Sequence, residues 1–226
     1  MCGRFTLTTL ARSLAEPFGL SGELPEFSPS YNVAPSREIA AVGADSEGER
    51  KLRLLRWGLV PHWAKDPDIG SRMINARAES VAEKPTFKAA FRRRRCLILA
   101  DGFYEWRSEG GSGPKQPYHI RLQGGAPYAF AGLWESWERD GQKIRSCTII
   151  TTEANELLAK IHHRMPVILG PENYASWLSA DSGEDEMLSL LAPYPSEKME
   201  AYPVSTHVNR PANNDSGCVE PVGQAL

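Results

Sequence analysis

Residues 96–107 read Cys-Leu-Ile-Leu-Ala-Asp-Gly-Phe-Tyr-Glu-Trp-Arg, and this stretch carries much of the information about the fold. Its first five residues form a continuous apolar run, which is typical of a strand buried on both faces. Asp101-Gly102 is a turn signal, and the aromatic residues after it indicate that a second strand follows. The stretch therefore predicts a fold built from short strands.

Short apolar runs separated by turn residues recur along the chain. Further strands are predicted at residues 37–42, 51–60, 117–123, 127–134, 144–151, 167–169 and 201–206. The two strands that flank Gly124-Gly125 are expected to pair as a hairpin. Helices are predicted at about 8–18, 85–92, 153–160, 170–178 and 184–191, with irregular segments at 21–35 and 64–72.

Strands and helices do not alternate regularly, which argues against a doubly wound parallel sheet. We expect an α+β, mostly β fold of short antiparallel strands with peripheral helices. The chain has 226 residues, of which 41% are hydrophobic and 24% charged. These values are ordinary for a globular protein with one core, so we expect a single domain over residues 1–226.

No stretch approaches the roughly 20 apolar residues that span a bilayer. No apolar run follows Arg4, so a signal peptide is not expected either. Cys96 and Cys147 lie in apolar runs and are expected to be buried rather than disulfide-bonded. These features predict a cytoplasmic protein in a reducing compartment, without a membrane partner.

Metal and cofactor motifs are absent from the sequence. It contains no Cys-x-x-Cys, no His-Glu-x-x-His, no phosphate loop and no dinucleotide fingerprint, so we expect no metal and no cofactor. The net charge is −2. Residues 1–150 contain 22 basic and 17 acidic residues, a charge of +5, whereas residues 151–226 contain 4 and 11, a charge of −7. A basic face from the first part would suit an anionic partner. The run Arg92–Arg95 is expected to be a solvated helix end.

Cys2 would begin the chain once Met1 is removed, and it would then carry an α-amine and a thiol. The amine can attack an aldehyde to give a Schiff base, after which the thiol closes a thiazolidine ring. Alternatively, the thiol is an ordinary nucleophile and the amine is its base. An α-amine has a pKa of about 7.7–8.0, so part of it is neutral near pH 7. The alternative is an inert cysteine near a frayed terminus.

Other polar residues could assist such chemistry. Glu105 lies between two aromatic residues, and desolvation there would raise its pKa and suit it to proton transfer. Strand alternation equally allows Glu105 to point outward. His162 and His163 have a suitable pKa range, although they could instead cap a helix. Asn75 could orient an amine or a sugar hydroxyl, or only stabilise a turn.

Arg4 and Arg77 each adjoin one of these candidate residues. Their planar guanidinium groups suit phosphate oxygens, so both are candidate DNA contacts. Trp63 follows a proline in a loop-like segment and could stack on an unpaired base. The other five tryptophans are expected in the core.

Eight short motifs, spread over nearly the whole chain, resemble in sequence and in order those of the SOS response-associated peptidase (SRAP) family, the abasic-site processing proteins. They comprise Met1–Phe5, Tyr31–Pro35, Trp57-Gly58, Asn75–Arg77, Ala100–Trp106, Thr148–Thr152, Ile161–Pro166 and Tyr202–Ser205. The family fold is a β-rich α+β domain with a positively charged DNA groove, which agrees with the predicted strands.

The resemblance implies that the protein crosslinks covalently to abasic sites in single-stranded DNA and shields the lesion. Cys2 would form the thiazolidine with the sugar aldehyde after removal of Met1. Asn75 would position the α-amine and the sugar, Glu105 would transfer protons, and His162 would assist opening of the sugar.

The resemblance also implies phosphate contacts by Arg4, Arg77 and Thr151, while Trp63 only loosely matches the aromatic wedge that family members use to separate bases. It implies an enzyme with a peptidase activity tied to release of the initiator methionine, and possible lyase-like activity. We expect a monomer that associates with the nucleoid on DNA damage.

Two other functions fit parts of the sequence. In an N-terminal-nucleophile glutamine amidotransferase, Cys2 would attack a glutamine side-chain amide. A non-catalytic protein that binds single-stranded DNA would use the basic face and aromatic residues, with salt-sensitive affinity and no covalent product.

Overall fold

The computed structural model describes residues 2–45, 47–108, 110 and 113–226, and its strands form two sheets. The first sheet has the order β13-β8-β7-β1-β2, and its neighbours pair antiparallel. Its strands are β1 (Phe5–Leu7), β2 (Ser30–Val33), β7 (Gly102–Arg107), β8 (Gln116–Leu122) and β13 (Met199–Pro203).

The second sheet has the order β11-β10-β4-β3-β6-β9-β12, and β5 pairs with β10. Its strands are β3 (Glu38–Ala44), β4 (Arg50–Trp57), β5 (Asn75–Arg77), β6 (Arg95–Ala100), β9 (Tyr128–Arg139), β10 (Gln142–Glu153), β11 (Arg164–Pro166) and β12 (Ile168–Leu169). Because β9 pairs with both β6 and β10, the strands β3, β4, β6, β9 and β10 close into a barrel. The pairings of β10 with β4 and with β5 are parallel.

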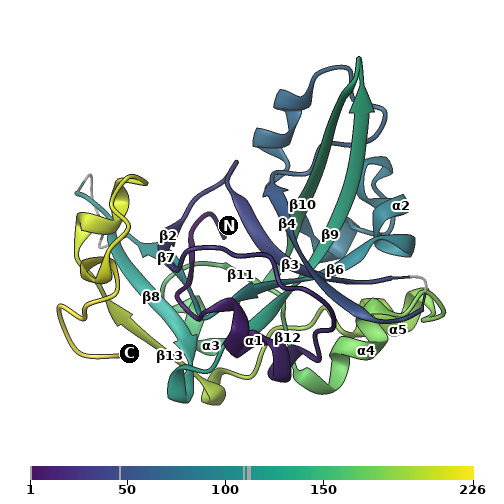
Figure 1. Cartoon of the computed structure of the whole chain (residues 1–226). Helices are drawn as coiled ribbons and strands as arrows, with labels where there is room; N and C mark the ends of the chain where they lie inside the picture. The colour runs from purple at the N-terminus through teal and green to yellow at the C-terminus, as the bar shows by residue number, and fades with distance from the viewer. Residues whose placement is uncertain (1, 46, 109, 111–112) are drawn as a thin grey trace.

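Short helices lie on the outside of the sheets (Figure 1). They are α1 (Ala11–Phe18), α2 (Pro85–Arg93), α3 (Glu156–Ala159), α4 (Tyr174–Leu178) and α5 (Glu184–Ser189). The expectation of an α+β, mostly β fold with peripheral helices is confirmed. None of the helices in the described part of the chain has the length and hydropathy that a membrane span requires.

The stretch 96–107 connects the two sheets. Every residue of β6 is buried, because β6 pairs with β3 and β9 inside the barrel. At Asp101 the chain leaves the barrel and continues as β7 of the other sheet. The Asp101 carboxylate accepts hydrogen bonds from the Thr6 hydroxyl and the Thr8 amide, each at 2.6 Å. A side chain on Gly102 would collide with the ring of His119, so glycine is required at this crossing.

The predicted hairpin across Gly124-Gly125 is wrong. β8 pairs with β7 and β13 in the first sheet, whereas β9 pairs with β6, β10 and β12 in the second. Both glycines have positive φ, at 80° and 70°, and the turn carries the chain from one sheet to the other. Asp140 and Gly141, also with positive φ, instead form the hairpin turn between β9 and β10.

Two other local predictions need correction. Residues 21–35 are not irregular throughout, because Ser30–Val33 form β2. The arginine run is not fully solvated, because Arg95 is buried. Its guanidinium donates hydrogen bonds to the carbonyl oxygens of Trp177 and Phe91, at 2.7 and 2.6 Å.

The tryptophan prediction is only partly right. Trp57, Trp137 and Trp177 are buried, whereas Trp106 and Trp134 are partly exposed. The cysteine prediction is confirmed, since all four cysteines lie within the described residues and are buried and free.

Candidate active site

Cys2 lies three residues before the start of β1 and is completely buried. β1 pairs antiparallel with β7, with Phe5 opposite Phe103. Continuing this register by two residues places Gly3 beside Glu105, so Cys2 lies next to that carboxyl group. Burial raises the pKa of the Cys2 thiol well above its usual value, and the charge of Glu105 raises it further. The thiol is therefore protonated at neutral pH.

Glu105 points into the protein, with 3% of its surface exposed. The alternative that it faces solvent is therefore wrong. Burial raises the pKa of Glu105 to about 7. A carboxyl group with this pKa exists in both protonation states at neutral pH, and so it can both donate and accept a proton.

His162 lies between α3 and β11, and its ring stacks on His163 with 4.4 Å between ring centroids. Its Nδ1 lies 3.0 Å from the Arg164 amide nitrogen and 3.2 Å from the Arg164 carbonyl oxygen, so the backbone of Arg164 holds the ring in place. The His162 backbone amide donates to the Leu158 carbonyl oxygen of α3 at 2.8 Å, so the structure is also compatible with a helix-capping role. Burial lowers the pKa of His162, which favours the neutral ring at pH 7.

Asn75 begins β5, where it lies opposite Ile149 of β10. Its Nδ2 donates to the carbonyl oxygen of Ile74 at 3.0 Å. Its Oδ1 is buried, and no described residue donates a hydrogen bond to it. A buried acceptor without a donor is unfavourable, so Oδ1 is available for a donor such as an amine.

One electrostatic and one topological observation relate Glu105, His162 and Asn75 to one another. The charge of Lys115 lowers the pKa of both Glu105 and His162, so both side chains lie within its electrostatic reach. β10 is flanked by β5, which carries Asn75, and by β11, which starts two residues after His162. Lys115 thus relates Glu105 of β7 to His162, while Asn75 and His162 lie on or beside the two strands that flank the end of β10.

Sequence reasoning missed Lys115 and Arg164. Lys115 precedes β8 and is exposed, and no motif marks it. Arg164 donates to the carbonyl oxygen of Thr151 at 2.6 Å and forms an ion pair with Glu79. It thereby holds β11 against β10. Its place directly after the histidine pair is the signal that could have revealed it.

The candidate DNA contacts have different environments. Arg77 and Trp63 are exposed, with 52% of the Trp63 surface accessible. Thr151 is only 1% exposed, and its hydroxyl lies 3.5 Å from the carbonyl oxygen of Ala76. Arg4 is partly buried, and its guanidinium donates to Asn32 Oδ1 at 2.7 Å and to the Val208 carbonyl oxygen at 2.9 Å.

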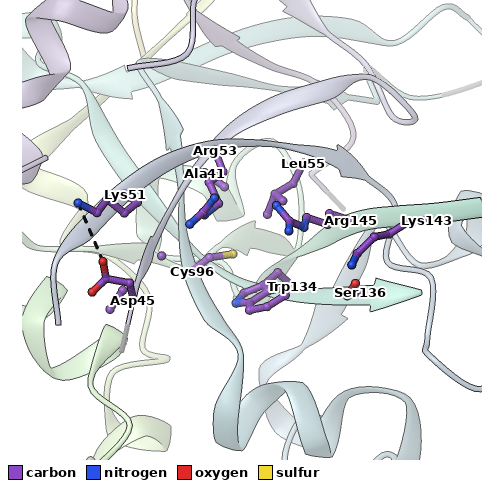
Figure 2. Close-up of a pocket in the computed structure, with 12 residues that line it drawn as sticks. Ala41, Asp45, Lys51, Arg53, Leu55, Cys96, Trp134, Ser136, Lys143 and Arg145 are labelled. Carbon is purple, nitrogen blue, oxygen red and sulfur yellow. Dashed lines mark ion pairs between the residues drawn. The ribbon is translucent and has the colours of Figure 1, made fainter. Parts of the chain in front are cut away.

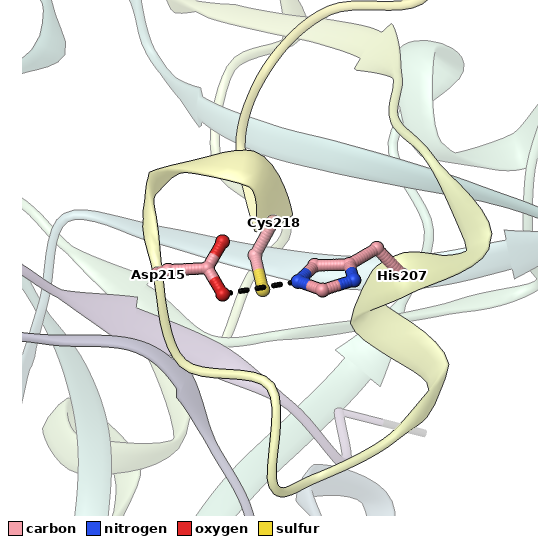
Figure 3. Close-up of side chains that lie close together, drawn as sticks. All are labelled: His207, Asp215 and Cys218. Carbon is pink, nitrogen blue, oxygen red and sulfur yellow. Dashed lines mark hydrogen bonds and ion pairs between the residues drawn. The ribbon is translucent and has the colours of Figure 1, made fainter.

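A separate group near the C-terminus has side chains that can bind metals (Figure 3). His207, Asp215 and Cys218 each offer one ligand atom, and these atoms lie within 4.8 Å of one another. His207 Nε2 lies 3.0 Å from Asp215 Oδ2, and Asn213 Nδ2 donates to Nδ1 of the same ring at 3.0 Å. These hydrogen bonds join residues of the C-terminal segment to one another, so they explain the close approach of the three side chains without a metal ion.

The family model described as SOS response associated peptidase (SRAP) matches residues 1–211. The chain belongs to the SRAP family. It is similar to abasic site processing protein YoqW of Bacillus subtilis, at 48% identity over 97% of this chain and 99% of the relative. It is also similar to abasic site processing protein HMCES of Gallus gallus, at 35% identity over 87% of this chain and 67% of the relative.

The chain is also similar in fold to a solved crystal structure of a protein from Bacteroides thetaiotaomicron. That structure has a TM-score of 0.89 and 28% identity, and the match covers 98% of this chain and all of the other. The sequence motifs between Cys2 and Ser205 had predicted this family, and they include the candidate active-site residues.

Proposed function

We propose that this protein processes abasic sites in single-stranded DNA through a thiazolidine crosslink on Cys2. The observation that carries the proposal is the buried position of Cys2 beside Glu105, whose pKa is about 7. The names of its relatives support the substrate. The proposal further comprises one domain over residues 1–226, a monomer without metal or cofactor, and a cytoplasmic protein that joins the nucleoid on damage.

The first step is opening of the deoxyribose ring to its aldehyde. We assign to His162 the donation of a proton from Nε2 to the ring oxygen, while a base removes the proton of the C1′ hydroxyl. The α-amine of Cys2 then attacks C1′ and forms a carbinolamine. Asn75 Oδ1, the buried acceptor without a donor in the described chain, would hold that amine.

Glu105 would serve the next two steps in opposite protonation states. Protonated Glu105 donates to the carbinolamine hydroxyl, which leaves as water and gives the Schiff base. The Cys2 sulfur then bonds to C1′ of the protonated Schiff base, and the Glu105 carboxylate takes up the thiol proton, which restores its acid form. The sum is one aldehyde plus one aminothiol giving one thiazolidine and one water.

The raised pKa of the thiol fits this order of events. A thiolate would compete with the amine as the first nucleophile, whereas a buried thiol reacts after the Schiff base has formed beside it. Glutamine amidotransferase chemistry would instead need the sulfur to attack first, with the α-amine as its base.

Removal of Met1 is part of the proposal, because an acylated nitrogen cannot form a Schiff base. Met1 lies outside the described residues. We include in the proposal a peptidase activity limited to this release, and a lyase-like activity. The proposed contacts to the DNA strand are Arg77, Trp63, Thr151 and Arg4, of which Arg4 would exchange its internal hydrogen bonds for phosphate.

A denaturing gel after incubation with single-stranded abasic DNA tests the proposal. The wild-type protein should give a shifted band, and Cys2→Ala should give none. Cys147→Ala is the matched control, because it removes another fully buried cysteine and should retain the band. A stable band at full yield with Cys2→Ala would refute the proposal.

A further inference from the structure

The barrel formed by β3, β4, β6, β9 and β10 is filled at one end and hollow at the other. At the filled end, Phe5 of the first sheet packs against Trp57 and Phe130. At the other end a pocket of about 250 Å³ is lined by residues from each of these strands (Figure 2). Barrels of about eight strands are already filled by side chains, so a hollow in a narrower one is unusual.

Small side chains produce this hollow. Ala41, Gly43 and Cys96 line the pocket. Cys96 lies opposite Gly132, where an added Cβ would be 3.0 Å from the Cys96 sulfur. Trp134 borders the same space, and its partly exposed indole ring presents a flat apolar surface to the pocket (Figure 2).

The rim of the pocket is positively charged. One carboxylate, Asp45, also lines the pocket and lies 4.0 Å from Lys51 (Figure 2). Lys51 pairs with Glu49 as well, and Lys143 pairs with Glu138, so both lysines are partly neutralised. Arg53 and Arg145 are exposed, and neither forms an ion pair with any other residue within the described ranges. The two guanidinium groups project toward the same space in Figure 2. Two like charges beside one pocket repel each other unless an anion lies between them.

We propose that the hollow mouth of the barrel binds a nucleotide through a terminal phosphate monoester. Arginine offers planar donor pairs that match phosphate oxygens, and Trp134 offers a stacking surface for the base. A phosphate monoester carries about −1.5 to −2 charges at pH 7, which matches two arginines, whereas an internal phosphodiester carries one. At about 250 Å³ the pocket is slightly smaller than the usual ligand pocket of about 300–1,000 Å³, so it suits one small, partly exposed ligand and not a threaded strand.

This site is separate from Cys2 and does not rest on the crosslinking proposal. The ligand could be a free nucleotide or the 5′-phosphorylated end of a strand, since both present the same group. Titration calorimetry of the whole protein with dAMP, and with inorganic phosphate, tests for the site. We expect dAMP to bind more tightly than phosphate and deoxyadenosine to show no binding.

Arg53→Gln and Arg145→Gln should each weaken dAMP binding about tenfold or more, because each removes a charge-assisted contact. Arg12→Gln, at an exposed arginine of α1, is the matched control and should leave the affinity unchanged. Trp134→Leu should weaken dAMP binding but not phosphate binding. All variants should retain crosslinking to abasic DNA, which separates this site from the active site.

A 5′-phosphorylated tetranucleotide distinguishes the two sources. If it binds more tightly than dAMP, the ligand is a strand end, and if only dAMP binds, it is a free nucleotide. The proposal is overturned if dAMP does not bind at millimolar concentration. It is equally overturned if folded Arg53→Gln and Arg145→Gln, checked by circular dichroism, bind dAMP as the wild type does.

Discussion

Glu105 is the residue whose environment says most about the chemistry. Its carboxyl group is buried next to the Cys2 thiol, and this burial raises its pKa to about 7. The sequence placed Glu105 between aromatic residues but left open which way it pointed, because strand alternation depends on which face of the sheet is covered. Packing of β7 between β1 and β8 decides the question.

Glu105→Gln should slow crosslinking by roughly 10²-fold or more, because glutamine cannot transfer a proton. Binding to abasic DNA should change little, since the amide has nearly the same shape. Crosslinking rates from gels and affinities from fluorescence anisotropy would separate the two effects. Equal losses in rate and affinity would indicate a structural role instead.

The same substitution should alter how stability depends on pH. An unfolded glutamate has a pKa of about 4.3, whereas that of folded Glu105 is about 7. Between these pH values the folded state binds more protons, so the free energy of unfolding of the wild type falls as pH rises. The free energy of unfolding of Glu105→Gln lacks this decrease. The difference between variant and wild type should therefore shift in favour of the variant by up to about 3 kcal/mol from pH 5 to pH 8.

Urea unfolding of both proteins at the two pH values measures this gain. The comparison cancels the other titrating groups, which both proteins share. A difference in unfolding free energy that is the same at pH 5 and pH 8 would contradict a buried Glu105 with a raised pKa.

At the scale of elements, local patterns predicted strands well and their partners poorly. β6 was evident from its apolar run, because a strand covered on both faces needs no polar positions. The partner of β8 was not, since it is set by contacts with β13, about 80 residues away, rather than by the glycines that follow β8. Strand partners are set by distant contacts, so the sequence identified Asn75 and His162 as candidates but could not predict that β5 and β11 would flank β10.

The β5-β10-β11 edge depends on Arg164 in particular. Arg164→Gln should lower the free energy of unfolding by about 1–3 kcal/mol, because the carbonyl oxygen of Thr151 loses its charged donor. Glu79→Gln, which removes only the half-exposed partner of the ion pair, should cost less than about 1 kcal/mol. Denaturant unfolding of both variants measures the difference, and equal effects would contradict this role of Arg164.

At the scale of the whole molecule, the N-terminal strand links distant parts of the chain. β1 joins β2 and β7 of the first sheet, and Phe5 reaches into the barrel of the second. Arg4 binds the C-terminal segment through Asn32 and the Val208 carbonyl. These contacts fix Cys2 where the two sheets meet, so the reactive terminus is positioned by the fold rather than by its own short sequence.

The intact mass of the adduct with an abasic oligonucleotide tests the central claim most directly. The account predicts the mass of the protein without Met1 plus that of the DNA minus one water. This mass should not change on borohydride treatment, because a thiazolidine, unlike a Schiff base, has no imine to reduce. An adduct that retains Met1, or one that gains two hydrogens on reduction, would contradict ring closure by the nitrogen and sulfur of Cys2.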